Sequence, residues 1–284
     1  EEPLHLIPRS LREEFEEDYD IKIEGDLCPV CRYRLINEYE GDYTKFPITQ
    51  AAFSVRGRKG VGVVPPMDPN TQDTSLLIGS EDISKLDLYP EDDPRALSLN
   101  GAFNVGNRGI VEFVEVFKNE IEFLHTMITA TQEKNVPSPG KQAMIYFDGV
   151  ILAHCNEAEW NKFKSEHTNE AILDRIVRVN IPYCLEYQQE VKIYDKLINR
   201  SDYRCHIAPH TLEIAAMFAV LSRLKPSNKV DPLTKMKIYN GEEIVESGLI
   251  KKVDIKDLRE EVEDEGMTGI STRFIMKAID AAAA

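Results

Sequence analysis

The chain has 284 residues, 42% of them hydrophobic, which is enough to bury a sizeable core and fits one domain with a smaller second one. Its formal net charge of −15 argues against nucleic-acid binding, which needs Lys and Arg gathered on one face. The charge fits a cytoplasmic protein. No run of about 18 apolar residues occurs, so the sequence predicts no membrane span.

The first 37 residues predict an acidic helix and a second, short helix. The chain begins at Glu1 without a signal-peptide pattern, and its start resembles the middle of a longer protein. Ser10–Asp20 is predicted to be helical, with Ser10 as its N-cap. Gly25–Asn37 predicts a turn followed by a short helix, and it contains a CxxC pair at Cys28 and Cys31. This pair is half of a zinc-ribbon pattern without its second half, so we expect reduced thiols in a tight turn and no metal.

The next stretch is β-rich and punctuated by glycine. Phe46–Val64 predicts a pair of strands, with the basic residues near Arg58 at the hairpin tip or, alternatively, on a phosphate or a partner. The GRKGVG text there is not a phosphate loop, because no GK[ST] follows. Pro65–Asp73 and Tyr89–Arg95 predict loops. Between them, Ser75–Leu86 predicts a short strand and then a helix capped by Ser80.

Two short apolar runs form the centre of the chain. Ile110–Val114 and Val150–Ala153 predict buried strands, and each is followed by a polar side chain, Glu115 or Asn156. The segment between them, Val116–Thr131, has the length and apolar spacing of a helix. A strand–helix–strand unit predicts parallel strands whose carboxyl ends meet at one edge, where ligands of such sheets bind. We expect Glu115 and Asn156 within roughly 10 Å of each other, facing a cleft between this sheet and a helical subdomain.

The last hundred residues predict an all-helical subdomain. Apolar stripes, caps and breakers mark five segments there. They are Tyr183–Arg200, His210–Leu224, Pro232–Ile238, Gly241–Ser247 and Asp254–Glu263.

Several separated stretches also carry a family resemblance. They are GAFNVGNRGIVEFVEVFK, DGVILAHCNEAEW, EAILDRIVRVNIPYCL and APHTLEIAAMFAVLSRL. In this order and spacing they resemble the AAA+ module of PrkA-type bacterial serine protein kinases, from about Glu2 to Phe274. More loosely, the same order resembles other AAA+ ATPases, including the MoxR and enhancer-binding types. The resemblance implies an α/β fold, a parallel sheet flanked by helices that lacks its phosphate-loop part, followed by an all-helical lid.

The resemblance also implies boundaries and cofactors. It places the α/β core, with a CxxC and β-rich insertion at about 25–95, in residues 1–183, the lid in 184–265 and the start of a kinase-like domain in 266–284. It implies ATP and Mg²⁺ as cofactors. No GxxxxGK[ST] occurs, so the loop that cradles the phosphates would lie upstream, and this chain alone is expected to be inactive.

The resemblance assigns candidate roles at the carboxyl edge of the sheet. Glu115 stands at the position of the Walker B glutamate, which orients and deprotonates the attacking water. Val114 replaces the usual Asp that positions Mg²⁺, and Glu112 is the carboxylate that could contribute instead. Asn156 stands at the sensor 1 position, which contacts the γ-phosphate. Without the resemblance, Glu115 is a surface carboxylate and Asn156 a turn former.

Two further candidates lie later in the chain. Arg175 matches the arginine finger, which acts on the ATP of a neighbouring subunit, with Arg178 as the alternative and a surface ion pair as the plain interpretation. His210 replaces the sensor 2 arginine, and a helix cap explains it equally well.

The implied function is the ATP-binding module of a PrkA-type serine protein kinase, with a protein substrate, a homo-oligomeric assembly and no nucleic acid or membrane partner. An AAA+ unfoldase or ATP-dependent protease is one alternative. A regulatory scaffold with a degenerate ATP site is another, which Val114 and His210 favour.

Overall fold

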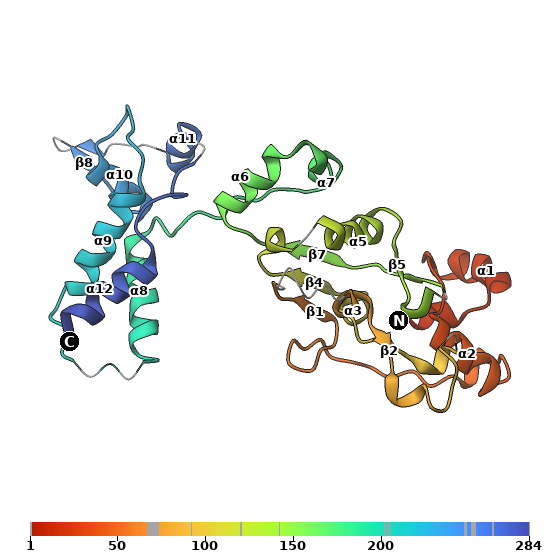
Figure 1. The fold of residues 1–284 in the computed structure, drawn as a ribbon. Helices are drawn as coiled ribbons and strands as arrows, with labels where there is room; N and C mark the ends of the chain where they lie inside the picture. Colours follow the sequence, from red (N-terminus) through yellow and green to blue (C-terminus); the bar gives the residue numbers. More distant parts are fainter. Residues whose placement is uncertain are drawn as a thin grey trace. The chain divides into compact units, whose positions relative to one another are not determined.

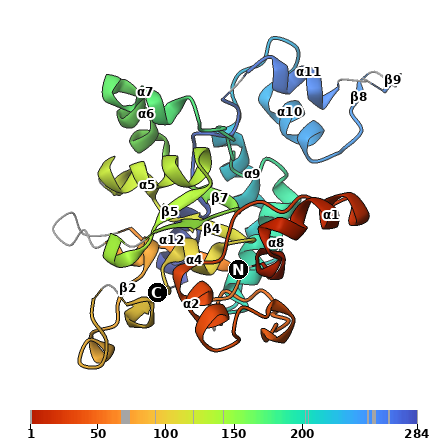
Figure 2. The ribbon, with the colours of Figure 1, turned by 90° about the vertical axis from the view of Figure 1, so that its right-hand side faces the viewer.

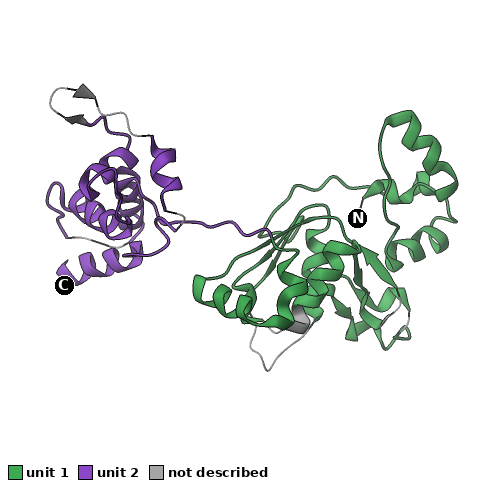
Figure 3. Cartoon of the chain, turned by 90° about the horizontal axis from the view of Figure 1, so that it is seen from above, with its two compact units in different colours: residues 1–176 green, residues 177–284 purple. Residues whose placement is uncertain are grey.

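The computed structural model describes residues 2–66, 74–91, 93–119, 121–141, 143–201, 203, 205–246, 249–250, 254–262 and 264–283. The chain forms two compact units, Glu1–Ile176 and Val177–Ala284, shown in Figure 3. The expected domain boundaries, with the core ending at Tyr183, remain predictions.

The first unit is built on a parallel three-stranded sheet. Its strands are β1 (Val61–Val64), β4 (Ile110–Phe113) and β7 (Val150–Ala153), in the order β1-β4-β7 (Figure 1). All pairs are parallel, and Phe113 lies opposite Ala153 in the β4–β7 register. The prediction that the two central apolar runs are parallel strands of one sheet is therefore confirmed.

The core of this unit lies between the sheet and its covering helices. Val111 and Phe113 of β4 are fully buried, and Phe103 of α4 (Ala102–Gly106) packs against Phe113 with ring centroids 6.0 Å apart. A Cβ added to Gly62 of β1 would lie 2.3 Å from the Ala102 carbonyl oxygen, so only glycine allows α4 to approach the sheet this closely. Burial of each large apolar side chain contributes about 1.5–3 kcal/mol.

The segment between β4 and β7 is more complex than one helix. It contains a 3-10 helix (Val116–Lys118), then α5 (Ile121–Gln132), then the antiparallel pair β5 (Asn135–Pro137) and β6 (Met144–Tyr146). The predicted helix is present, whereas the β5–β6 hairpin was not predicted.

The N-terminal region contains α1 (Arg9–Tyr19) and α2 (Pro29–Asn37). The prediction of Ser10 as N-cap is wrong, because α1 begins at Arg9 and Pro8 takes the cap position. Proline fixes its own φ near the value found here and stops the helix from extending backwards. The predicted short helix is confirmed, but it begins at Pro29, so the CxxC pair forms its first turn rather than a separate turn before it. The Cys28 sulfur is the N-cap and accepts a hydrogen bond from the Cys31 amide at 3.4 Å.

Two predictions between Phe46 and Leu86 are wrong. The predicted strand pair contains only β1, preceded by an isolated bridge between Ser54 and Lys59. The predicted strand and helix of Ser75–Leu86 occur in the opposite order. There α3 (Ser75–Ile78) comes first, followed by β2 (Ser80–Glu81), paired with β3 (Leu97–Ser98), and a 3-10 helix at Ile83–Lys85 that Asp82 caps in place of Ser80. Of the predicted loops, residues 67–73 and 92 lie outside the described part of the chain.

The second unit is a helical bundle with a small hairpin. Its helices are α8 (Tyr187–Ile198), α9 (Thr211–Arg223), α10 (Pro232–Tyr239), α11 (Ile255–Glu260) and α12 (Thr272–Ala283). The prediction of a helix at Gly241–Ser247 is wrong for the described residues, because β8 (Val245–Glu246) pairs antiparallel with β9 (Leu249–Ile250). Ser247 lies outside the described part of the chain. One buried cluster joins four of the helices through Tyr194, Ala216, Met236 and Ile275.

A buried arginine connects distant segments of this unit. Arg223 donates hydrogen bonds to the carbonyl oxygens of Ile270 and Cys184, at 2.9 and 2.8 Å, and to Glu190 Oε1 at 2.8 Å. The Arg223 and Glu190 side chains are 0% and 1% exposed. Thr272 Oγ1 also donates to Glu190 Oε1, at 2.8 Å.

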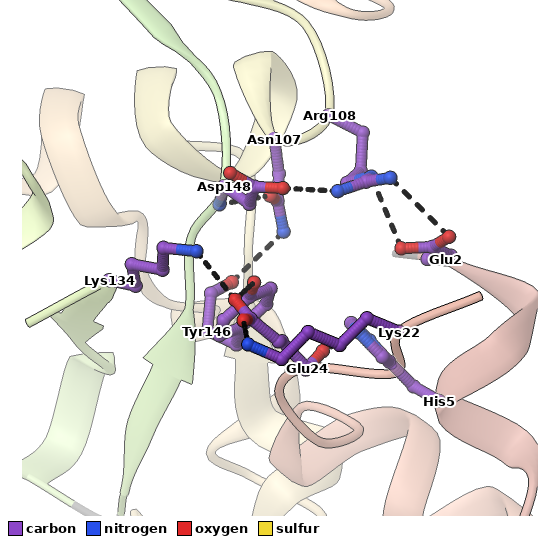
Figure 4. A network of polar contacts seen from close by, with 9 residues as sticks. All are labelled: Glu2, His5, Lys22, Glu24, Asn107, Arg108, Lys134, Tyr146 and Asp148. Carbon is purple, nitrogen blue, oxygen red and sulfur yellow. Dashed lines mark hydrogen bonds and ion pairs between the residues drawn. The ribbon is translucent and has the colours of Figure 1, made fainter. Parts of the chain in front are cut away.

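A second polar network lies at the amino end of the strands in the first unit (Figure 4). Asn107 donates to the Tyr146 carbonyl oxygen and accepts from the Asp148 amide, both at 2.9 Å. Arg108 pairs with Asp148 and with Glu2. The network therefore ties the N-terminal connector and the NRG turn to the loop before β7, at the edge opposite Glu115.

Within the same network, the Glu24 carboxylate contacts Lys134, Lys22 and the Tyr146 hydroxyl (Figure 4). The hydrogen bond from Lys134, followed by that from Lys22, lowers the pKa of Glu24 from 4.5 to about 2. A lowered pKa means that this carboxylate stabilises the fold above its unfolded-state pKa, and that the contribution is lost as the pH falls through the folded value.

We therefore expect Glu24→Gln to reduce stability at pH 7, with a difference from the wild type that shrinks between pH 4.5 and pH 2. Urea unfolding at several pH values measures this difference in the free energy of unfolding. Glu14→Gln, at an exposed position of α1, is the matched control and should show no such trend. A pH-independent difference at Glu24 would contradict the assignment.

Candidate functional site

Glu115 follows β4 directly and has an unusual backbone conformation. Its φ of 50° and ψ of 52° place it in the left-handed region, which costs a non-glycine residue about 1–2 kcal/mol. On either side, the His154 amide donates to Phe113 and the Val116 amide donates to the His154 carbonyl, both at 3.1 Å. These bonds hold the ends of β4 and β7 together, so Glu115 leaves the sheet at its carboxyl edge. Such strain is common at functional positions.

Asn156 follows β7 at the same edge, as predicted. It is the N-cap of α6 (Glu157–Ser165), and its Oδ1 accepts a hydrogen bond from the Glu159 amide at 2.8 Å. Next along the chain comes α7 (Glu170–Leu173), which lies beside α6 in both views (Figure 1 and Figure 2). The start of α6 thus brings a partial positive charge to the carboxyl edge, which favours anions.

Lys118 joins the two sides of this edge. Its Nζ lies 2.6 Å from Glu115 Oε2 and 3.9 Å from Glu159 Oε1. The hydrogen bond with Glu115 raises the pKa of Lys118. Lys118 was not predicted as a site residue, although its three-residue spacing from Glu115 in a helical segment was a usable signal.

Glu112 lies inside β4, three residues before Glu115. Its Oε1 is 3.7 Å from His154 Nε2, and both side chains are about half exposed. The two form an ion pair only when His154 is protonated. The structure therefore places Glu112 beside His154, while Glu115, Lys118 and Glu159 form the contacts at the edge itself.

Arg175 follows α7 in the first unit. Its guanidinium donates to the Ala171 carbonyl oxygen and, at 2.7 Å, to Gln132 Oε1 at the end of α5. Both are exposed contacts. The contacts described for Arg175 thus lead to α5 and α7, and Glu115 and Asn156 are not among them.

His210 lies in the second unit, at the first position before α9. Its φ is 64°, and its side chain makes no capping hydrogen bond, so the cap interpretation does not hold for the imidazole. Instead, Nδ1 lies 2.9 Å from Glu213 Oε2 on the exposed surface. His210 also lines an open pocket of about 550 Å³, together with Asp195, His206 and Glu213.

The part of the chain that the structure describes contains neither a metal-binding cluster nor a membrane-spanning helix. Over those residues, no group of three or more His, Cys, Asp or Glu side chains is arranged to hold a metal ion. Likewise, no helix in this part of the chain combines the length and apolar character needed to cross a bilayer.

With the edge geometry in place, comparison with known proteins identifies the family. The sequence profile of the PrkA AAA domain matches residues 1–231. The chain belongs to the PrkA family. The profile of the PrkA serine protein kinase C-terminal domain matches residues 233–284. The expected fold is confirmed by this match and by the parallel sheet with its helical C-terminal region. An AAA domain is an ATP-binding module, so the PrkA match also supports ATP as the ligand class.

Curated PrkA relatives carry two different names. "ATP-dependent protease PrkA" of Bacillus subtilis (strain 168) is 42% identical over 283 residues, covering 98% of this chain and 44% of the relative. "Serine/threonine kinase YeaG" of Escherichia coli (strain K12) is 39% identical over 268 residues, covering 93% of this chain and 42% of the relative. The chain therefore spans less than half the length of these PrkA relatives.

Solved structures give a more distant likeness. NtrX from Brucella abortus matches with a TM-score of 0.42 and 14% identity, over 66% of this chain and 40% of NtrX. NtrX in complex with ATP matches with a TM-score of 0.40 and 14% identity, over 57% of this chain and 35% of NtrX. At these values, the likeness adds nothing to the PrkA assignment.

Proposed function

We propose that this chain supplies one edge of the ATP site of a PrkA-type serine protein kinase and couples that site to protein phosphorylation. The carrying observation is that Glu115 and Asn156 follow adjacent parallel strands and leave the sheet at one edge. A carboxylate and the start of a capped helix at that edge provide a proton acceptor and an anion-binding end.

In this proposal Glu115 accepts the proton of the attacking water or hydroxyl, and Asn156 orients the γ-phosphate. Mg²⁺ takes carboxylate and phosphate oxygens, and it would be held mainly by the phosphates, because Val114 has no side-chain oxygen where the usual Asp would lie and Glu115 serves as the proton acceptor. When bound, Mg²⁺ would neutralise charge on the phosphates. Glu112 and His210 are the weaker candidates, because Glu112 lies beside His154 and the imidazole of His210 already contacts Glu213.

The phosphate loop would come from a segment upstream of this chain. β7 is one of the two outer strands of the described sheet, and its Val150 and Leu152 side chains are 56% and 52% exposed. An edge strand with exposed apolar side chains is a place where a further strand adds. We propose that the upstream segment pairs there and brings its loop to the Glu115 edge.

The experiment that tests the function uses the full-length protein, γ-labelled ATP and casein as a protein substrate. Transfer of label to casein seryl groups is the expected result. ATP-dependent fragmentation of casein without label would instead favour the protease named for the Bacillus subtilis relative. If neither labelling nor fragmentation of casein is detected, the result would favour a regulatory scaffold.

We further propose that the full-length protein is a homo-oligomer in which Arg175 acts on the site of the neighbouring subunit. Arg175→Ala should then slow ATP turnover while leaving nucleotide affinity nearly unchanged, because such a residue stabilises transition-state charge. Turnover rates and calorimetric affinities measure the two effects.

Mixed oligomers provide the control for Arg175. Arg175→Ala subunits retain Glu115, and Glu115→Gln subunits retain Arg175, so mixing the two slowed variants should restore part of the turnover. Mixtures that show no gain in turnover would contradict this action between subunits and leave Arg175 with a structural role in its own subunit.

A further inference from the structure

Lys118 stands between two carboxylates at the Glu115 edge and has no role in the proposed function so far. It belongs to the 3-10 helix Val116–Lys118, and its Nζ contacts Glu115 closely, at 2.6 Å, and Glu159 loosely, at 3.9 Å. A single ammonium group with two acceptors at unequal distances can exchange one for the other through a small side-chain rotation.

The second acceptor has unused capacity. Glu159 Oε2 is buried and has no hydrogen-bond partner among the residues that the structure describes. The Glu159 side chain is 20% exposed, against 41% for Glu115. A buried carboxylate oxygen without a donor is unfavourable, so a closer approach of Lys118 would stabilise Glu159. The Asn156 cap holds the backbone of Glu159 in place for it.

The first pair is weak enough to break. The Lys118 and Glu115 side chains are 47% and 41% exposed, and an ion pair this exposed contributes less than a factor of about five to an equilibrium. While the pair exists, one oxygen of Glu115 is occupied by an ammonium group and is a poorer proton acceptor for a water molecule.

We propose that Lys118 is a positioning residue that holds Glu115 while the site is empty and passes to Glu159 when Glu115 turns to the nucleotide. The proposal rests on the proposed function, because it concerns the same site. The exchange leaves Lys118 paired in both states, so releasing Glu115 does not require an unpaired ammonium group. Glu159 thereby becomes part of the site without touching the nucleotide.

The resting pair is tested in this chain by NMR titration of the Lys118 ammonium group. Glu115→Gln should lower the pKa of Lys118 more than Glu159→Gln does, because Glu115 is the closer acceptor. A Lys118 pKa unchanged by Glu115→Gln would overturn the proposal.

The exchange is tested by ATP turnover of the full-length protein in a double-mutant cycle. Glu159→Gln should lower kcat about two- to five-fold, the range set by an exposed pair, because Lys118 then keeps its hold on Glu115. In a Lys118→Met background, Glu159→Gln should have no effect, and Lys118→Arg should restore the dependence on residue 159. Equal effects of Glu159→Gln in both backgrounds would show a structural role for Glu159 and overturn the exchange.

The two proposals fail in different ways. Full turnover by Glu115→Gln would remove the proposed function of Glu115. Wild-type turnover that depends on Glu115, with no coupling between Lys118 and Glu159, would remove only the exchange. If the full-length protein turned over no ATP, both the site and the exchange would fail, and the NMR titration would still decide the resting pair.

Discussion

Replacement of Arg223 by methionine is expected to destabilise the second unit by about 3–5 kcal/mol, the usual cost of removing one partner of a buried ion pair. Arg223 is 1% exposed, and its three hydrogen bonds reach Cys184, Glu190 and Ile270. Methionine keeps much of the volume and the helix propensity, so the loss reports the guanidinium group. Denaturant unfolding followed by far-ultraviolet circular dichroism measures it.

The pH dependence separates this effect from simple repacking. Burial acts to raise the pKa of Glu190, but the hydrogen bonds from Arg223 and Thr272 outweigh it and hold the pKa below 4.5. Without Arg223, the buried Glu190 carboxyl favours its neutral form, so protonation in acid removes an unfavourable buried charge from the variant. In the wild type, the same protonation weakens the ion pair with Arg223 and lowers the free energy of unfolding. The difference in stability between the two should therefore shrink from pH 7 to pH 4.

Arg273→Met is the matched control for Arg223, since Arg273 lies exposed near the start of α12. Its expected effect is within about 0.5 kcal/mol. A loss at Arg223 no larger than that at Arg273, or a difference that grows in acid, would contradict the assignment of a buried ion pair.

The other large effect is expected at Glu115. In the full-length protein, Glu115→Gln should reduce ATP turnover by about 10²–10⁴-fold, the usual contribution of a general base. Glutamine keeps the size and polarity of the side chain but accepts a proton poorly, so nucleotide affinity should change little. Measurements of steady-state turnover and of equilibrium ATP binding separate a loss of catalysis from a loss of nucleotide affinity.

Glu133→Gln, just after α5 on the exposed surface, is the matched control for Glu115 and should leave turnover unchanged. Loss of ATP binding together with turnover at Glu115 would indicate damage to the edge rather than loss of a proton acceptor. Retained turnover would exclude Glu115 as the base.

The parallel sheet was predictable because each strand carries its own signal. Short apolar runs that end on Glu115 and Asn156 predict strands and the edge they share, and the structure confirms the pairing of β4 with β7. The family motifs added the AAA assignment, which the profile match confirms. Contacts of Lys118 with Glu159 across the edge were not predictable, because they depend on how α6 packs beside the 3-10 helix.

The wrong predictions come from segments where local preference is weak. In Ser75–Leu86, the apolar run is too short for periodicity to separate a strand from a helix, and Gly79, at φ 90°, ends α3 there. Around Gly241–Ser247, the three glutamates favour a helix, but Gly241 adopts a φ of 79° soon after α10. Pairing of β8 with β9 then outweighs the weak propensity of the segment.

The core of the second unit has a mechanical consequence. The PrkA AAA profile ends at residue 231 and the C-terminal profile begins at 233. Yet Tyr194 and Ala216, before this junction, share one buried cluster with Met236 and Ile275, after it. The junction between the two profiles therefore lies inside one packed core and cannot act as a hinge. We expect α8, α9, α10 and α12 to move as one rigid body, and a chimera of two relatives joined at residue 232 would combine mismatched halves of that core.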